Sequence, residues 1–151
     1  MFVLYFSIIG FSAETKKFFF NNRTIDINNL DFFYGILTLS FLGIILNFFL
    51  PLKLFSLPVL ILGLYFFYKN FKINLFKINF IKLLVILFLT VFIFKSNGLA
   101  YDSALYHLQT IKWIADYKIS LGLSNLEPRF GLNSLWHIFI SLLNIEIKNI
   151  K

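Results

Sequence analysis

Four long runs of hydrophobic residues, separated by short polar stretches, dominate the chain. They cover residues 31–50, 52–68, 80–95 and 130–147. Each run is close to the roughly 20 apolar residues that an α-helix needs to cross the hydrocarbon core of a bilayer. A fifth run, residues 1–13, reaches only about 20 Å at 1.5 Å per residue, against a core of about 30 Å. This pattern predicts an all-α, multi-pass membrane protein with four to five hydrophobic helices.

Two prolines mark the first two hydrophobic runs, one between the runs and one inside the second. Pro51 ends the first run, and the short turn 51–53 predicts that the first two spans form an antiparallel hairpin. Pro58 lies inside the second run, where we expect a kink because proline lacks the N–H that a helix interior needs. No internal repeat or linker is visible, so residues 1–151 are interpreted as one membrane domain.

Composition supports the membrane class and excludes several other classes. The 151 residues are 59% hydrophobic, 21% aromatic and only 14% charged, which leaves too little charge to cover a soluble domain. We therefore expect the bilayer as partner and no nucleic acid, although the net charge is +7. Without cysteine, disulfides and thiolate metal sites are excluded, and two histidines are too few for a zinc site without carboxylates. We expect no cofactor, while the need for a divalent metal stays open.

The distribution of charge predicts the orientation of the spans. Residues 69–82 contain four lysines and no acidic residue, which is typical of a cytoplasmic loop. By alternation, residues 96–129 form an outer loop, and the basic stretch 14–30 is cytoplasmic. The outer loop balances its basic and acidic residues: Lys112, Lys118 and Arg129 against Asp102, Asp116 and Glu127. We expect a protein of the bacterial inner membrane with the loop 96–129 in the periplasm.

The outer loop contains an amphipathic pattern at 103–117 that predicts a helix. Its apolar stripe has helical spacing and consists of Leu105, Leu108, Ile111, Ile114 and Ala115. Another face carries Asp102, Tyr106, Gln109 and Trp113. A helix of this kind can lie flat in the headgroup layer with its polar groups outward.

Asp102 is the strongest candidate for chemistry in this loop, since it stands at the start of the predicted helix just after a span. It can cap the helix by accepting backbone hydrogen bonds, or it can act as a base, and these two roles are compatible. His107 lies about 140° around the helix from Asp102, so the two are poorly placed to pair directly. A hydrogen-bonded interface role is the more ordinary one for His107. Tyr106, four residues from Asp102, shares its face.

Arg129 follows Pro128 at the boundary of the last run. It can serve as an anchor at the rim of a span, or its guanidinium can bind a lipid phosphate or pyrophosphate. The sequence leaves both roles open. Trp113 and Trp136 are interpreted as aromatic residues of the membrane interface.

A longer pattern in this region carries a resemblance to a known family. It reads Asp102-Ser-x-x-Tyr106-His107-Leu-x-x-Ile-Lys112-Trp113-Ile, followed by Gly122-Leu-x-Asn125-Leu-x-x-Arg129-x-Gly131-x-Asn133-Ser134. In it the chain resembles a group of bacterial multi-pass membrane proteins that is similar to the C-type (GT-C) membrane glycosyltransferases. The resemblance covers about residues 80–145, with its specific residues confined to 102–134. Glu127-Pro128 stands where that group usually has His-Gly before the arginine.

The resemblance implies transfer of a sugar from a polyprenyl-phosphate donor on the outer membrane face. Asp102 occupies the place of the acidic residue that acts there as general base or positions the acceptor. Arg129 would then bind the carrier phosphate, with Tyr106 and His107 as further candidate substrate-binding residues. Enzymes of this class have many more spans, so we interpret the chain as an N-terminal part of a larger protein. We expect this fragment alone not to be a competent enzyme.

Two alternatives remain open from the sequence. The chain can be a non-catalytic subunit or scaffold whose outer amphipathic helix binds lipid or a partner membrane protein. A transporter is disfavoured because the complete spans lack the buried charges typical of an ion pathway. Asn47 is their main polar residue, and one asparagine can simply form hydrogen bonds between helices.

Overall fold

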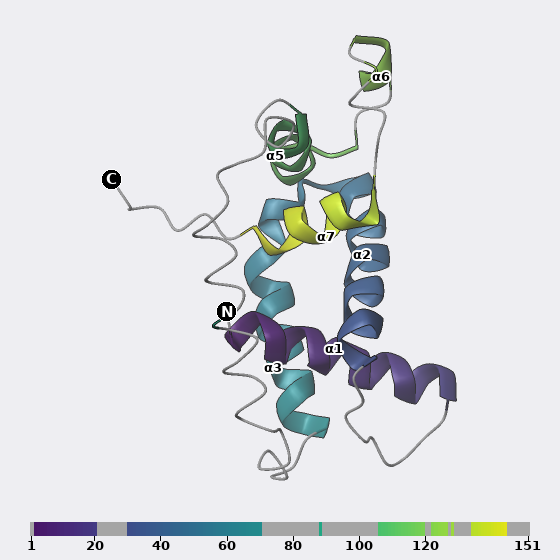
Figure 1. Ribbon diagram of the computed structural model, residues 1–151, viewed down its shortest axis with the longest axis vertical. Coiled ribbons are helices and arrows are strands. Elements are labelled where there is room, and N and C mark those ends of the chain that lie inside the picture. The colour runs from purple at the N-terminus through teal and green to yellow at the C-terminus, as the bar shows by residue number, and fades with distance from the viewer. Residues whose placement is uncertain are drawn as a thin grey trace.

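The computed structural model describes residues 2–20, 30–70, 88, 106–119, 122–126, 128 and 134–144, and the fold is given for these residues. Every element within them is a helix, so the predicted all-α class is confirmed for this part of the chain (Figure 1). The elements are α1 (Phe2–Phe20), α2 (Asp31–Phe49), the short 3₁₀ helix η1 (Leu52–Leu54), α3 (Ser56–Asn70), α5 (Leu108–Asp116), α6 (Leu123–Leu126) and α7 (Leu135–Leu143).

Helices α2 and α3 form the antiparallel hairpin that Pro51 predicts, with η1 at its tip. Helices α1 and α7 join α2 to α3. Helix α1 lies across both of them near one end, and α7 lies across both near the other. One buried cluster joins the four helices and η1. Its members are Ile8, Phe11, Leu39, Leu52, Val59, Phe139 and Leu142.

Of the helices in the described residues, α2 alone is long and apolar enough to cross a membrane, judged by length and composition. Its bounds agree closely with the predicted run 31–50. The predicted span 80–95 lies outside the described residues except for Phe88, which is helical. Within the predicted run 130–147, α7 has nine residues, and residues 130–133 and 145–147 of that run lie outside the described residues.

Helix α3 begins four residues later than the predicted run 52–68. The backbone first forms η1, and the N–H of Val59 then bonds to the carbonyl of Phe55 at 2.9 Å to start α3. Pro58 is thus the third residue of α3, in the first turn, where the N–H groups have no partner within the helix. The interruption that we expected inside the helix therefore falls before it.

Helix α1 continues seven residues beyond the hydrophobic run 1–13, through a stretch that the sequence marks as polar. It crosses α3 and α2 at points where glycines bring the backbones together. A Cβ on Gly10 would lie 2.0 Å from the carbonyl oxygen of Gly63, and one on Gly35 would lie 2.2 Å from that of Ile8. Glycine permits so close an approach of two backbones because it has no Cβ. The crossing places the polar end of α1 beside the ends of α2 and α3.

Candidate functional site

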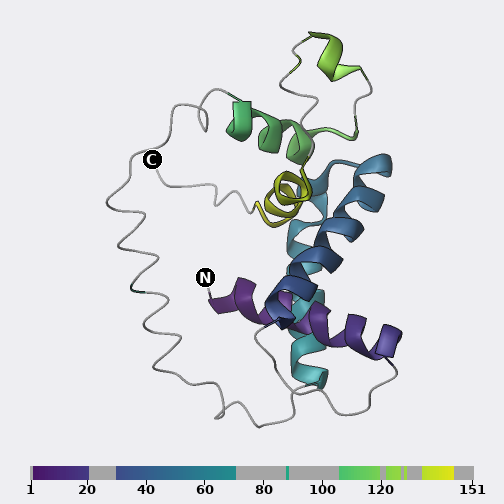
Figure 2. The same cartoon turned by 45° about the vertical axis from the view of Figure 1, so that its right-hand side comes forward.

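Helix α5, which carries the residues of the family resemblance, packs on η1 and α7 at the tip of the hairpin (Figure 2). Its inner face consists of Thr110, Ile111 and Ala115, with Ile114 half-buried. Of the predicted apolar stripe, Ile111 and Ala115 are buried and Ile114 is half-buried against the protein, whereas Leu108 is exposed. Leu105 lies outside the described residues.

Asn47 fixes the C-terminal end of α5. The side-chain amide of Asn47 donates to the backbone carbonyls of Ile114 at 3.2 Å and Tyr117 at 3.0 Å. The backbone carbonyl of Asn47 accepts from the N–H of Ile119 at 2.9 Å. The last carbonyls of a helix have no partner within it, so these bonds satisfy groups that α5 leaves open. The prediction that Asn47 forms hydrogen bonds between segments is confirmed.

A serine joins α5 to α7 in the buried centre of this corner. The hydroxyl of Ser141 lies 2.9 Å from the carbonyl oxygen of Ile111 and 2.7 Å from that of His137, so one proton serves two acceptors. At the start of α7 the hydroxyl of Ser134 accepts from the N–H of His137 at 3.2 Å, which is a regular N-cap.

The two histidines of the chain meet between α5 and α7. Nδ1 of His107 lies 2.9 Å from Nε2 of His137, and the ring centroids are 5.0 Å apart. His137 is buried, with 7% of its surface exposed, and the Tyr106 ring lies 4.2 Å from that of His107 on the other side. One imidazole donates and the other accepts, so the bond links the tautomers of the two rings. The expected interface role of His107 is confirmed, and its partner is His137.

His137 was missed as a site residue because thirty positions separate it from His107. The sequence signal was that His107 lies in the predicted outer loop and His137 near the outer end of the run 130–147 that follows it. Of the predicted site, Tyr106 and His107 lie together, whereas Asp102 and Arg129 lie outside the described residues. Within the described residues, no three side chains of His, Cys, Asp or Glu gather closely enough to hold a metal ion.

A second polar cluster lies at the opposite end of the hairpin, between α1 and the ends of α2 and α3. Lys16 pairs with Asp31, and the Lys69 ammonium lies 3.2 Å from Oε1 of Glu14. The Asn70 amide donates to the same Glu14 oxygen at 3.0 Å, and its own oxygen accepts from Lys17. Nothing in the sequence indicated that these charges are paired, since a polar stretch after a hydrophobic run is typical of a solvated loop.

These partners change the ionisation of Glu14. Partial burial alone would raise the pKa of its carboxyl. The hydrogen bonds from Asn70 and Lys69, together with the positive charges of Lys69 and Lys17, outweigh that effect. The pKa of Glu14 therefore lies below its ordinary value, and the side chain is a carboxylate at neutral pH.

The described part of the chain is thus an all-helical protein with one helix suited to crossing a membrane, a hydrogen-bonded corner at one end and a cluster of paired charges at the other. The chain belongs to a family described as a domain of unknown function, DUF8201, whose model matches residues 1–150. No curated protein and no solved structure matches the chain.

Proposed function

We propose that this protein is a membrane-embedded, glycosyltransferase-like protein that acts on a polyprenyl-phosphate-linked sugar at the outer face of the bacterial inner membrane. In this proposal α2 and α3 lie in the bilayer, the segment 69–82 is cytoplasmic and the segment 96–129 is periplasmic. The proposal rests on the resemblance of residues 102–134 to the group that is similar to the GT-C enzymes.

One observation supports the proposal best. Helix α5, with Tyr106 and His107 beside it, packs at the tip of the hairpin, whereas Lys69 stands at the opposite end of α3. Lys69, the first lysine of the lysine-rich segment, and α5 therefore lie at opposite ends of the hairpin. This is the arrangement that the positive-inside rule requires if 69–82 is cytoplasmic and 96–129 is external.

The proposed roles follow from the chemistry of the side chains. Asp102 acts as the general base, or positions the acceptor hydroxyl, and it precedes Tyr106 by four residues. Arg129 supplies positive charge to the leaving phosphate of the carrier. Tyr106 and His107 provide further groups for hydrogen bonding to the substrate, and the bond to His137 holds the His107 ring in place.

The test is the substitution Asp102→Asn in the full-length protein, reconstituted in proteoliposomes with polyprenyl-phosphate-linked sugars. We expect the transfer rate to fall by about 10²–10⁴-fold, the usual contribution of a general base, with expression and insertion unchanged. Asp116→Asn is the matched control, because Asp116 lies in the same segment but faces Lys53 at 3.5 Å. Full transfer activity in Asp102→Asn would eliminate the base assignment.

A second function is favoured by the outer surface of α5. Leu108 is exposed at the start of the helix, and Trp113 and Tyr117, whose ring centroids lie 5.4 Å apart, are exposed near its end. Such a surface fits a non-catalytic membrane subunit or scaffold that binds lipid or a partner protein through α5. Under this function Leu108→Ser with Trp113→Ser would abolish the association, and Asp102→Asn would change nothing.

A further inference from the structure

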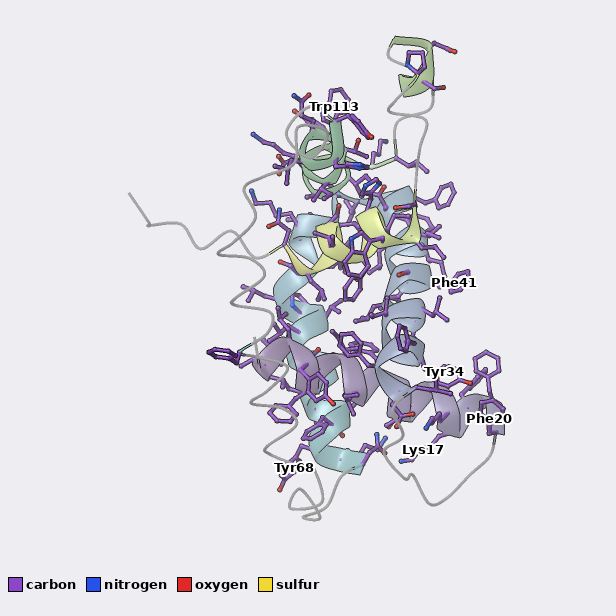
Figure 3. The ribbon with its side chains drawn as sticks, in the orientation of Figure 1. Lys17, Phe20, Tyr34, Phe41, Tyr68 and Trp113 are labelled. Carbon is purple, nitrogen blue, oxygen red and sulfur yellow. The ribbon has the colours of Figure 1, made fainter. Side chains whose placement is uncertain are left out.

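Where α1 ends, apolar side chains are exposed and a pair of charged side chains is buried. The last three residues of the helix, Phe18, Phe19 and Phe20, are 84%, 71% and 59% exposed. The side chains of Lys16 and Asp31, by contrast, are only 17% and 2% exposed in their ion pair. Figure 3 shows Phe20 at the free end of α1, where the helix projects past α2. Leu30 and Phe33, where α2 begins, are exposed as well.

This arrangement is the reverse of what water would select. A helix in water places its lysines outward and buries its phenylalanines, since each buried phenylalanine contributes about 1.5–3 kcal/mol. Here the Lys16–Asp31 pair lies inside while the three aromatic rings face outward. A cluster of exposed apolar side chains of this kind marks a contact with protein or membrane.

Charge decides between these two media. In the described residues near this end, Lys16, Lys17 and Lys69 exceed Glu14 and Asp31 by one positive charge. The segment 69–82 that continues from α3 adds three lysines after Lys69 and no acidic residue. A net positive charge in this part of the sequence, beside exposed aromatic rings, is complementary to an anionic leaflet, where phenylalanines enter the boundary between headgroups and acyl chains.

The direction of α1 fixes how deep these rings can lie. In both views α1 runs across α2 and α3 near the Asp31 and Asn70 ends, and it does not run alongside them (Figures 1 and 2). If α2 and α3 cross the bilayer, α1 lies close to its plane at the end that carries Lys69. Because Gly10 and Gly63 have no side chains, the backbone of α1 packs directly on that of α3 at this end of the hairpin.

We propose that α1 is an interfacial helix and not a span, and that Phe18, Phe19 and Phe20, with Leu30 and Phe33, dock into the headgroup and acyl-chain boundary of the anionic leaflet on the Lys69 side. This inference rests on the proposed membrane location. It adds a lipid-binding surface at the end opposite to the segment 96–129.

The test uses single-cysteine variants of the full chain, which has no native cysteine. Phe19→Cys, Phe41→Cys and Tyr68→Cys each carry a nitroxide label, in vesicles of equal parts phosphatidylglycerol and phosphatidylcholine. Depth is measured from the relaxation of the label by oxygen and by a water-soluble nickel complex. All three sites are exposed, so the label fits without repacking.

We expect the label at Phe19 to lie about 5–10 Å below the headgroup boundary, at a depth similar to that at Tyr68 at the end of α3. Phe41, near the middle of α2, serves as the control and should lie about 15 Å below it, at the centre of the bilayer. In vesicles of phosphatidylcholine alone, the Phe19 label should move toward water while the Phe41 label stays in place.

Each other result overturns the inference in a distinguishable way. A Phe19 label as deep as Phe41 would make α1 an inserted helix, and one fully open to the nickel complex would leave the patch in water. Protection from both reagents would mean that protein covers the patch. If the Phe41 label itself is open to the nickel complex, the proposed membrane location of α2 fails. The Phe19 label then shows separately whether α1 contacts the vesicle.

Discussion

The two ends of the α2–α3 hairpin are held together by different kinds of interaction. At the tip, side chains make directional hydrogen bonds: Asn47 to the end of α5, Ser141 between α5 and α7, and His107 to His137. The Lys53–Asp116 pair at this end is partly exposed. At the opposite end, α1 is held by the buried Lys16–Asp31 pair, by the partly exposed Lys69–Glu14 pair and by glycine contacts in which backbones touch.

This difference matters for what each end can do. A neutral hydrogen bond has a net value of about 0.5–1.5 kcal/mol, so the corner at the tip can rearrange around a ligand at modest cost. A buried charge left without its partner costs several times more, and a backbone contact has no side chain that can rotate away. The α1 end is therefore built as a fixed anchor, and the α5–α7 corner as the adaptable site.

The largest predicted effect is at the buried ion pair. Asp31→Asn leaves the Lys16 ammonium uncompensated in a site where the Asp31 side chain is only 2% exposed, so we expect a loss of about 3–5 kcal/mol in the free energy of unfolding. Thermal unfolding in detergent micelles measures it. The double replacement Lys16→Met with Asp31→Leu should recover most of that loss, because no charge is then buried.

The matched control for Asp31→Asn is the aspartate-to-asparagine substitution at Asp116, in the ion pair at the hairpin tip. Lys53 and Asp116 face each other at 3.5 Å with side chains 39% and 27% exposed, so Asp116→Asn should cost less than about 1 kcal/mol. Equal losses for Asp31→Asn and Asp116→Asn would contradict the contrast between the two ends.

The next effect concerns the backbone contact under α1. In Gly10→Ala the new Cβ would lie 2.0 Å from the Gly63 carbonyl oxygen and 2.7 Å from the Phe67 nitrogen, so α1 must shift as a whole. We expect a loss of about 1–3 kcal/mol in the free energy of unfolding. Gly43→Ala near α7 meets only the Ile138 methyl at 2.7 Å, and it should cost less. A larger loss at Gly43 would show that the corner is the less tolerant end.

A smaller effect is expected at Asn47. In Asn47→Leu the carbonyls of Ile114 and Tyr117 lose their donor, and since Tyr117 is exposed, water can replace part of the bonding. The expected loss is about 1 kcal/mol, with faster hydrogen exchange confined to α5. Unchanged exchange in α5 would mean that α7 alone holds this helix.

The sequence predicts the elements of this fold better than it predicts their contacts. The hydrophobic run and Pro51 predicted the bounds of α2 to within one residue and the turn that follows it, because a long apolar run has few other solutions. The sequence also predicted that Asn47 forms hydrogen bonds to another segment, because a polar side chain in an apolar helix must find a partner. Its actual acceptors, the carbonyls of Ile114 and Tyr117, depend on how α5 docks, and no pattern within the run contains that information.

The polar end of α1 shows where sequence reasoning stops. Glu14, Lys16 and Lys17 ended the hydrophobic run, so the helix was predicted to end there as well. The helix continues because Asp31, Lys69 and Asn70 neutralise or bond these side chains, and those partners come from residues 15 to 56 positions away. The pair of His107 and His137 was missed for the same reason. Both cases depend on tertiary contacts that local pattern cannot supply.

The smallest effect is a pH dependence at the α1 end. The folded-state pKa of Glu14 lies below its ordinary value of 4.5, so its bonds to Lys69 and Asn70 stabilise the fold above that value and are lost as the pH falls through the folded pKa. We expect the midpoint of thermal unfolding to decrease between pH 6 and pH 4 more in the natural protein than in Glu14→Gln, and the difference to shrink at high salt because Glu14 is partly exposed. The other carboxyls titrate in both proteins and cancel in this comparison. A difference that vanishes at low salt would mean that Lys69 and Asn70 do not hold the Glu14 carboxylate, and that the anchor depends on Asp31 and the glycine contacts alone.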